Sequence, residues 1–421
     1  MEELHSLAKA YDQEDELREF RNQFHIPTDD QGKEKIYFCG NSLGLQPKSV
    51  AGAVEKELEN WRTKGVEGHF AEPEPWWTYH KKLKKPLAHL TGAKEHEVVA
   101  MNNLTTNLHL LMATFYQPTA ERYRIIIEAG AFPSDQYAAE SQVRWHGLDP
   151  QEALVELRPR LEEEILRTDD ILRTIEQYRD TLALVMLPGI QYYTGQFFDL
   201  QAIAQAAHQA GAKVGYDLAH AIGNVPMQLH EWNVDFAVWC SYKYLNSGPG
   251  NTGGAFVHER YAEDTDLPRL AGWWGYREED RFQMKPGFKP MYGVDGWQLS
   301  NANILPMAAQ RAALEVSEQA GMEQLRKKSL KLTGFLEQCI RAFDPNRKYI
   351  RIITPENPEE RGCQLSLVFS QQGKQVFEKL TQSGIIVDWR EPSVIRVAPA
   401  PLYNTFTEVY RFSEILRETL S

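Results

Sequence analysis

The sequence predicts an α/β protein with a large domain, whose mostly parallel sheet is covered by helices, and a smaller α+β C-terminal domain. Between about residues 100 and 260, strand-like and helix-like segments alternate, and this alternation is typical of parallel sheets. Beyond residue 305 the pattern changes to a long helical stretch followed by short strands. We therefore expect an N-terminal segment over residues 1–50 that packs with the small domain, a large domain over 51–305 and a small domain over 306–421.

Apolar spacing and helix-capping residues indicate the helices of the first two parts. The first 25 residues predict an amphipathic helix with four apolar side chains on one face: Leu4, Leu7, Ala8 and Tyr11. Further helices are expected over 102–116, 134–147 and 199–211. Each begins near an Asn, Thr, Ser or Asp that can accept a hydrogen bond from a free backbone N–H, and the last ends at a glycine.

Short apolar runs between these helices predict buried strands. In the large domain these runs cover residues 123–129, 181–189, 212–219, 234–240 and 253–259. In the small domain one long helix over about 306–343 should precede strands at 349–354, 363–370, 385–389 and 394–399, with helices at 374–384 and 406–420.

Composition narrows the function classes. The net charge of −12 is spread along the chain, which argues against a non-specific nucleic-acid binder, because such a protein needs a basic face. The cysteines are isolated, so we expect reduced thiols and no zinc ribbon: Cys39, Cys240, Cys339 and Cys363. The N-terminus lacks the apolar region of a signal peptide, and no apolar run approaches the roughly 18 residues of a membrane span. We expect a cytoplasmic protein.

A glycine-rich loop at residues 248–253, GPGNTG, matches the G-x-G-x-x-G pattern of dinucleotide-binding proteins. That pattern holds a phosphate only where it joins a strand to a helix. Here the next residues, GAFVHERY, are typical of a strand, and Pro249 fits the pattern poorly. We therefore expect a turn that lets the backbone pass close to something bulky beside Lys243.

Two consecutive strands of the predicted sheet end in charged residues. Asp217 ends one strand, and Lys243 follows the other. Ligands of an α/β sheet bind at the carboxyl ends of its strands. A lysine there can form a Schiff base with pyridoxal phosphate, and an aspartate can pair with the pyridinium nitrogen. A structural Lys–Asp ion pair explains these two residues equally well.

Other residues favour the cofactor. Phe132 offers a ring for stacking, and Thr105 and Ser134 offer hydroxyl groups at two helix N-termini, where free backbone N–H groups bind phosphate. Each of these features alone is more often simply a helix N-cap. His220 could bind a metal, but no second His or Cys lies at ligand spacing, so we expect a hydrogen bond to the cofactor or a structural role, and no metal.

On these residues the chain resembles the kynureninases, a family of fold-type-I pyridoxal-phosphate enzymes related to the class V aminotransferases. The set of shared stretches is specific, although no single stretch is. It spans residues 37–404 and comprises YFCGNSLGLQPK (37–48), LTTNLHLLM (104–112), FPSDQYAAESQ (132–142), YDLAHAIGNV (216–225), VDFAVWCSYKYLN (234–246), LAGWWG (270–275), LSNANI (299–304), RGCQLSL (361–367) and VIRVAPAPLYN (394–404).

The resemblance implies pyridoxal 5'-phosphate as the cofactor and a role for each matching residue. Lys243 would bind the cofactor as a Schiff base and later shuttle the α-proton, while Asp217 would keep the ring nitrogen protonated. Tyr242 would contact the phosphate and also hydrogen-bond the diolate formed from the substrate carbonyl. The other implied cofactor-binding residues are Leu104, Thr105, Phe132, Ser134, Asp135, His220, Trp273 and Asn301.

The resemblance also implies a homodimer with a shared active site, to which the neighbouring subunit contributes Trp273 and Asn301. Arg396 would bind the substrate carboxylate, a bidentate task that suits arginine. His69, Ser300 and Asn301 would surround the aromatic end of the substrate.

The reaction implied by the resemblance is hydrolysis of L-kynurenine, or of its 3-hydroxy form, to an anthranilate and L-alanine, in tryptophan degradation and the supply of NAD precursors. The sequence departs from the family at Pro188, where relatives often have Ser or Thr. Because proline has neither a hydroxyl nor an N–H, one cofactor hydrogen bond is lost or comes from Gln191 or a water.

Two alternatives stay open. The first is another enzyme of this fold, such as a cysteine desulfurase, which needs a cysteine nucleophile on a mobile loop, or a class V aminotransferase. None of the four cysteines lies in such a loop, and Cys363 enters a predicted strand. The second is a catalytically silent binding protein, against which the intact Lys243, Asp217 and Arg396 count.

Overall fold

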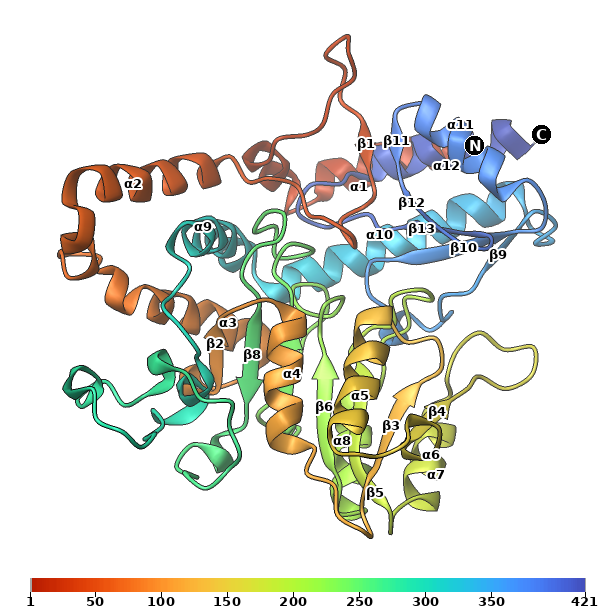
Figure 1. Ribbon diagram of the computed structural model, residues 1–421. Coiled ribbons are helices and arrows are strands. Elements are labelled where there is room, and N and C mark those ends of the chain that lie inside the picture. The colour runs from red at the N-terminus through yellow and green to blue at the C-terminus, as the bar shows by residue number, and fades with distance from the viewer. Residues whose placement is uncertain (1, 421) are drawn as a thin grey trace.

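A seven-stranded sheet forms the centre of the computed structural model, which describes residues 2–420 (Figure 1). Its strand order is β2-β8-β7-β6-β5-β3-β4, and all neighbours from β7 to β4 are parallel, whereas β8 runs antiparallel to β7 and β2. This confirms the predicted mostly parallel sheet. The strands are β2 (Val98–Ala100), β3 (Arg124–Glu128), β4 (Leu154–Leu157), β5 (Leu182–Pro188), β6 (Lys213–Asp217), β7 (Phe236–Trp239) and β8 (Gly254–Val257).

Side chains of these strands alternate between two apolar layers. In β3, Ile126 belongs to one layer and Ile125 and Ile127 to the other, which is the period of two that a strand imposes. Both faces are therefore buried, and the strands appear in the sequence as continuous apolar runs. Helices cover both faces, namely α4 (Leu104–Phe115) and α5 (Pro133–Trp145) on one and α7 (Thr168–Gln177) and α8 (Leu200–Gln209) on the other.

Capping explains where two of these helices begin. The Asn103 side chain accepts a hydrogen bond from the Thr106 N–H at 2.9 Å, and Asp199 accepts one from the Ala202 N–H at 3.0 Å. Both caps agree with the prediction. Helix α5 instead begins at Pro133, whose missing N–H is no loss in the first turn of a helix.

A second, antiparallel sheet lies near the C-terminal end of the chain, in the order β12-β13-β10-β9. Parallel strands β1 and β11 lie beside it, and helices α1, α11 and α12 pack on one another around the shared apolar core (Figure 1). The elements are α1 (Glu2–Glu14), β1 (Ile36–Tyr37), β9 (Ile350–Ile352), β10 (Leu365–Phe369), α11 (Gly373–Gln382), β11 (Ile385–Ile386), β12 (Asp388–Arg390), β13 (Val394–Val397) and α12 (Phe406–Leu420).

Two helix predictions need correction. The N-terminal helix ends at Glu14 rather than near residue 25, and a short 3-10 helix follows it. The single helix expected over 306–343 is two helices, α9 (Ile304–Ala320) and α10 (Met322–Phe343). Gly321 separates them with φ at +75°, in the left-handed region that favours glycine, so the chain changes direction there.

The remaining elements connect these layers. The other α-helices are α2 (Ser49–Lys64), α3 (Lys84–Thr91) and α6 (Pro150–Ala153). The 3-10 helices are η1 (Arg18–Gln23), η2 (Gly65–His69), η3 (Trp76–Leu83), η4 (Glu95–Glu97), η5 (Glu259–Tyr261), η6 (Trp273–Gly275), η7 (Arg281–Gln283), η8 (Gly293–Trp297) and η9 (Pro358–Glu360). Within residues 2–420, no helix is both long and apolar enough to cross a membrane.

We expect Gly215→Ala to lower stability. A Cβ at this position in the middle of β6 would overlap the ring of Phe236 on β7. Overpacking of this kind costs about 1–3 kcal/mol, so the urea midpoint of unfolding should fall. Gly334→Ala is the matched control, because Gly334 is exposed within α10 and its Cβ would meet open space. That variant should gain about 0.5–1 kcal/mol, and a Gly215→Ala midpoint at or above wild type would contradict the packing described.

Candidate active site

Four neighbouring parallel strands end at one edge of the large sheet and bring their last residues together. Glu128 ends β3, Pro188 ends β5 and Asp217 ends β6, while Lys243 follows β7 after a short turn. Because β7, β6, β5 and β3 are consecutive in the sheet, residues far apart in the sequence meet at this edge.

A cavity of about 260 Å³ opens at this edge. Ten of the predicted site residues line it: Leu104, Thr105, Phe132, Ser134, Asp135, Asp217, His220, Tyr242, Lys243 and Arg396. The sequence-based prediction had not included six other polar or charged residues of the wall or directly behind it: Asn41, Ser42, Glu128, Tyr192, Asp388 and Arg390.

Lys243 lies in the cavity with its ammonium nitrogen 6.0 Å from the centre of the Tyr242 ring. The N-terminal segment crosses its backbone, where the Gly44 N–H donates to the Tyr242 carbonyl at 2.8 Å. A Cβ on Gly44 would collide with the Lys243 carbonyl, so this crossing requires glycine. Burial raises the pKa of the Tyr242 hydroxyl, which therefore keeps its proton and can donate a hydrogen bond into the cavity.

Three carboxyl groups line the cavity together with this one ammonium group, those of Glu128, Asp135 and Asp217. Burial raises the pKa of Glu128 to about 8. Asp135 and Asp217 are hydrogen-bonded to each other, and burial raises the pKa of both, further for Asp135. Asp217 also accepts the Ala219 N–H at 2.7 Å. Near neutral pH the cluster therefore holds protons, and Asp217 is the member best placed to carry the negative charge.

The N-termini of α4 and α5 meet at one end of the cavity. The hydroxyl oxygens of Thr105 and Ser134 lie 2.7 Å apart, and both residues stand in the first turn of their helices. Two helix N-termini with hydroxyl groups between them form an environment that favours an anion such as a phosphate.

Phe132 and His220 complete the wall. The Phe132 ring is 43% exposed and packs edge-on against Tyr192, with ring centres 5.3 Å apart. His220 is buried, and its Nδ1 has no hydrogen-bond partner among the described residues. Burial, and then the positive charge of Lys243, lower the pKa of His220, so its imidazole is neutral. A buried ring nitrogen without a partner indicates that a ligand atom belongs beside it.

Arg396 lies across the cavity on β13, almost fully buried. Its Nη1 donates to the Tyr192 carbonyl at 2.8 Å, and its Nη2 contacts the Ser42 hydroxyl and the Asp388 carboxylate. The cavity therefore combines an anion site at its helix end with a guanidinium group at its opposite wall.

Four predicted residues lie outside this cavity. Trp273 is 41% exposed and packs against Trp274, while His69 packs against Trp76 with ring centres 5.3 Å apart. Ser300 and Asn301 are both exposed. Within one subunit these side chains do not join the residues around Lys243.

The glycine loop is not part of the cavity wall. Its residues 248–251 line a separate depression together with residues of the N-terminal segment. Gly248 and Gly250 have positive φ in open space, as a turn requires, while Gly254 packs on the Trp239 ring and only glycine fits there. As predicted, β8 follows this loop and no helix begins there. The bulky group that the backbone passes closely after this loop is thus the ring of Trp239.

Pro188 lines the cavity, and Gln191 does not replace a hydroxyl there. The Gln191 Oε1 accepts the N–H groups of Tyr193 and Thr194 at 2.6 and 2.7 Å, and its side chain also hydrogen-bonds Glu128. Gln191 thus supports the third carboxyl group of the cavity from behind.

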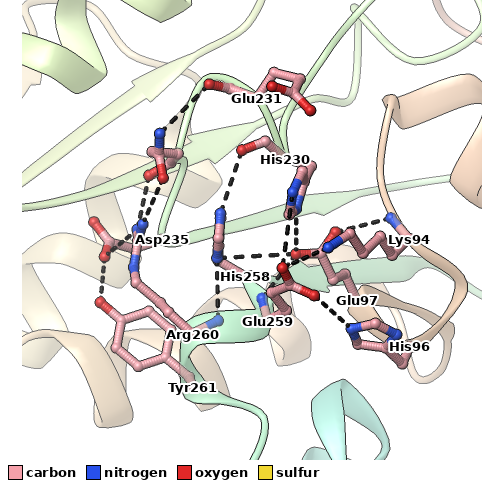
Figure 2. Close-up of polar contacts among 11 residues, drawn as sticks. Lys94, His96, Glu97, His230, Glu231, Asp235, His258, Glu259, Arg260 and Tyr261 are labelled. Carbon is pink, nitrogen blue, oxygen red and sulfur yellow. Dashed lines mark hydrogen bonds and ion pairs between the residues drawn. The ribbon is translucent and has the colours of Figure 1, made fainter.

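Figure 2 shows a second polar cluster, around Glu97, whose residues do not line this cavity. Possible ligand atoms of Glu97, His230 and His258 lie within 4.8 Å of one another. The Glu97 carboxylate, however, already accepts the N–H groups of Lys94 and Glu259 at 2.8 and 2.7 Å and contacts His230 Nδ1 at 3.0 Å.

Both ring nitrogens of His258 also have partners. Its Nδ1 accepts the Arg260 N–H at 3.1 Å, and its Nε2 lies 3.3 Å from the His230 carbonyl. The two imidazole rings also stack with an interplanar angle of 15°, so their in-plane lone pairs run nearly parallel instead of converging. The cluster ties two turns together, and we assign no metal to it.

Sequence reasoning missed Glu128 although a signal for it existed. It ends a predicted parallel strand, as Asp217 does, and that position alone places it at the ligand-binding edge. Ser42 offered no such signal, because it meets Asp388 only where the two ends of the chain come together. Asp388 and Arg390 lie two residues apart on β12, and only the folded chain places that strand beside the cavity.

Sequence comparison gives a consistent result over almost the whole chain. Residues 325–416 match the family described as "Kynureninase C-terminal domain", and residues 75–229 match the DegT/DnrJ/EryC1/StrS aminotransferase family. The chain is similar to a kynureninase of Flavobacterium psychrophilum, with 50% identity over 98% of this chain and 97% of that protein. It is also similar to a kynureninase of Myxococcus xanthus, with 53% identity over 99% of this chain and 97% of the relative.

Structure comparison bears on the fold alone. A cysteine desulfurase from Thermococcus onnurineus NA1 superposes with a TM-score of 0.75 and 19% identity over 91% of this chain and 94% of its own. The cysteine desulfurase CsdA from Escherichia coli gives a TM-score of 0.76 and 19% identity, over 96% and 98% respectively. Both have the α/β fold of type-I pyridoxal-phosphate enzymes.

The buried carboxyl group of Glu128 should make stability depend on pH. Its folded pKa of about 8 lies above the ordinary 4.5, so the folded state binds the proton more tightly and loses stability as pH rises through this window. The loss is at most about 1.4 kcal/mol per pH unit. In cofactor-free protein, we expect the urea midpoint of Glu128→Gln to rise relative to that of wild type as pH increases from 5 to 8.

Glu67→Gln, a change at an exposed glutamate, serves as the control and should follow wild type at every pH. A difference between Glu128→Gln and wild type that stays constant over this range would show that Glu128 is already ionised in the folded protein.

Proposed function

The chain belongs to the kynureninase family, and we propose that the cavity around Lys243 is its active site. The activity is the pyridoxal-phosphate-dependent hydrolysis of L-kynurenine, or of its 3-hydroxy form, to an anthranilate and L-alanine. The assignment of the site rests on one observation: Lys243, Asp217 and Arg396 line the same cavity. In the cell, the reaction belongs to the kynurenine pathway of tryptophan degradation.

The residues of the cavity fit the cofactor. The Asp217 carboxylate would hold a positively charged ring nitrogen, and the unpartnered Nδ1 of His220 could bond a polar atom of the ring or phosphate. Thr105, Ser134 and the helix N-termini around them suit the phosphate, and the exposed face of Phe132 suits the ring. When bound, pyridoxal phosphate supplies an electron sink for a carbanion at the substrate's α-carbon.

We assign the proton transfers to two neighbouring residues. Lys243 is the residue that would hold the cofactor, and its amine would also act as the general base that takes the α-proton of the substrate. Tyr242 keeps its hydroxyl proton because burial raises its pKa, so it can donate a hydrogen bond to the diolate that forms when water adds to the substrate's γ-carbonyl. That bond would stabilise negative charge before the carbon–carbon bond breaks.

Arg396 holds the opposite end of the amino-acid part of the substrate. Its guanidinium group is fixed by the Tyr192 carbonyl and by Asp388, and its Nε has no partner among the described residues. A bound carboxylate would accept from this nitrogen and would fix the direction in which the α-proton points.

We propose a homodimer with a shared site. Trp273 and Asn301 are exposed and lie outside their own cavity, as expected if each serves the neighbouring subunit. Several exposed apolar side chains accompany Trp273 and suit an interface: Leu270, Phe282, Met284, Phe288 and Tyr292. His69, Ser300 and Asn301 would then surround the aromatic end of the substrate from the same interface. We place this reaction in the cytoplasm, which the four free thiols favour.

Replacing the general base tests the site. We expect purified protein to be yellow and to release an anthranilate from kynurenine without a keto-acid acceptor. We expect Lys243→Ala to abolish turnover, because Lys243 is the one lysine among the described residues that line the cavity. Anthranilate fluorescence measures this directly. A variant that retained the wild-type rate would show that the base is another residue, and wild-type protein that took up no pyridoxal phosphate would contradict the assignment altogether.

Mixing two inactive dimers tests the shared site. We expect Trp273→Ala to lose cofactor affinity, and a mixture with Lys243→Ala to regain activity, because each mixed dimer contains one site with both residues intact. Random exchange of subunits should restore about a quarter of the wild-type activity. No recovery, with exchange verified by a tagged subunit, would show that Trp273 acts within its own subunit.

A further inference from the structure

The small antiparallel sheet brings a second arginine to the same wall as Arg396. Strands β12 and β13 pair so that Asp388 lies directly opposite Arg396. Arg390 follows Asp388 by two residues on β12 and therefore points to the same face of the sheet. Arg390 and Arg396 both line the cavity, whereas Asp388 lies behind them and is not part of its wall.

Asp388 holds both arginines. Its Oδ2 accepts hydrogen bonds from Arg396 Nη2, from the Ser42 hydroxyl and, at 3.2 Å, from Arg390 Nη2. Its Oδ1 lies 2.9 Å from Arg390 Nε. Burial alone would raise the pKa of Asp388, but the charge of Arg396, the hydrogen bonds and Arg390 outweigh it and lower the pKa, so the carboxylate is charged.

The charges of this group sum to one positive unit. Two guanidinium groups and one carboxylate leave a surplus of a single charge, which matches a single carboxylate of a ligand. The Arg396 side chain is 1% exposed, while that of Arg390 is 38% exposed on the open side of the wall. A carboxylate bound to Arg396 would thus have Arg390 within the same wall to complete its contacts.

We propose that Arg390 is a second residue that binds the α-carboxylate of the substrate, and that Asp388 is a positioning residue that holds Arg390 beside Arg396. This inference rests on the proposed function, because it takes the substrate to be an α-amino acid. The competing explanation is that Arg390 only neutralises Asp388 and never touches the substrate.

Two ligands that differ by one group separate these explanations. The first is L-kynurenine and the second is kynuramine, which is the same compound without the α-carboxylate. Binding of each to the holoenzyme changes the absorption spectrum of the cofactor, and this change gives both dissociation constants, while anthranilate release gives KM and kcat for kynurenine. The affinity ratio of kynurenine to kynuramine measures recognition of the carboxylate alone.

We expect Arg390→Gln to lower this ratio about 10-fold, since a charge-assisted hydrogen bond is lost, with a rise in KM and little change in kcat. The affinity for kynuramine should stay within about 2-fold of wild type. Arg390→Lys keeps the positive charge but not the paired N–H donors of a guanidinium group, so its affinity ratio should fall less than that of Arg390→Gln. Arg351→Gln is the matched control, because Arg351 lies on β9 of the same sheet and pairs with Glu164 instead.

A double-mutant cycle tests the role of Asp388. If Asp388 holds Arg390 in place, Arg390→Gln should have little further effect on the ratio once Asp388→Asn is present, whereas independent residues would give additive effects. Additive effects would refute the positioning role. An Arg390→Gln ratio equal to that of wild type, in protein with full cofactor content, would refute the binding role.

Outcomes that refute the roles of Arg390 and Asp388 can be distinguished from outcomes that refute the proposed function. Wild-type protein that releases anthranilate from kynurenine supports the proposed function whatever the Arg390 variants do. Wild-type protein that releases none would refute the proposed function and, with it, this inference.

Discussion

Compensation of buried charge around Lys243 is the constraint on which the pocket depends. Three carboxyl groups line one cavity with a single ammonium group, and burial raises the pKa of all three, so protons supply part of the charge balance. Asp135 and Glu128 stay largely protonated, which leaves Asp217 to carry the charge. In the proposed site this arrangement would favour a positively charged ring beside Asp217 over a neutral one, and it would thereby select the protonated cofactor that can take up electrons.

Residues from both sheets line the pocket. The parallel sheet aligns the ends of β3, β5, β6 and β7 and so fixes the reactive end of the pocket. The antiparallel sheet brings Arg396 and Arg390 to the opposite wall through the pairing of β12 with β13. Each part has its own apolar core, so the distance between Lys243 and the two arginines depends on how the two parts pack together.

Much of this could be predicted from the sequence, because it follows from local patterns. Apolar runs and capping residues gave the strands and helices, and the rule for parallel strands placed Asp217 and Lys243 side by side. The break at Gly321 was missed because apolar spacing continues through it and its positive φ is visible only in space. Arg390 was missed because it joins the wall only through the pairing of β12 with β13, which sets Asp388 opposite Arg396.

Both ends of the chain contribute to one wall of the pocket. Asn41 and Ser42 reach it from the N-terminal segment, whose strand β1 pairs with β11. Arg396 lies on β13, the last strand before the final helix. During synthesis Lys243 and Asp217 therefore leave the ribosome long before Arg390 and Arg396. A nascent chain that has reached only β8 contains the charged residues at the end of the parallel sheet but neither of these arginines, so we expect the proposed carboxylate site to be the last part of the pocket that the growing protein acquires.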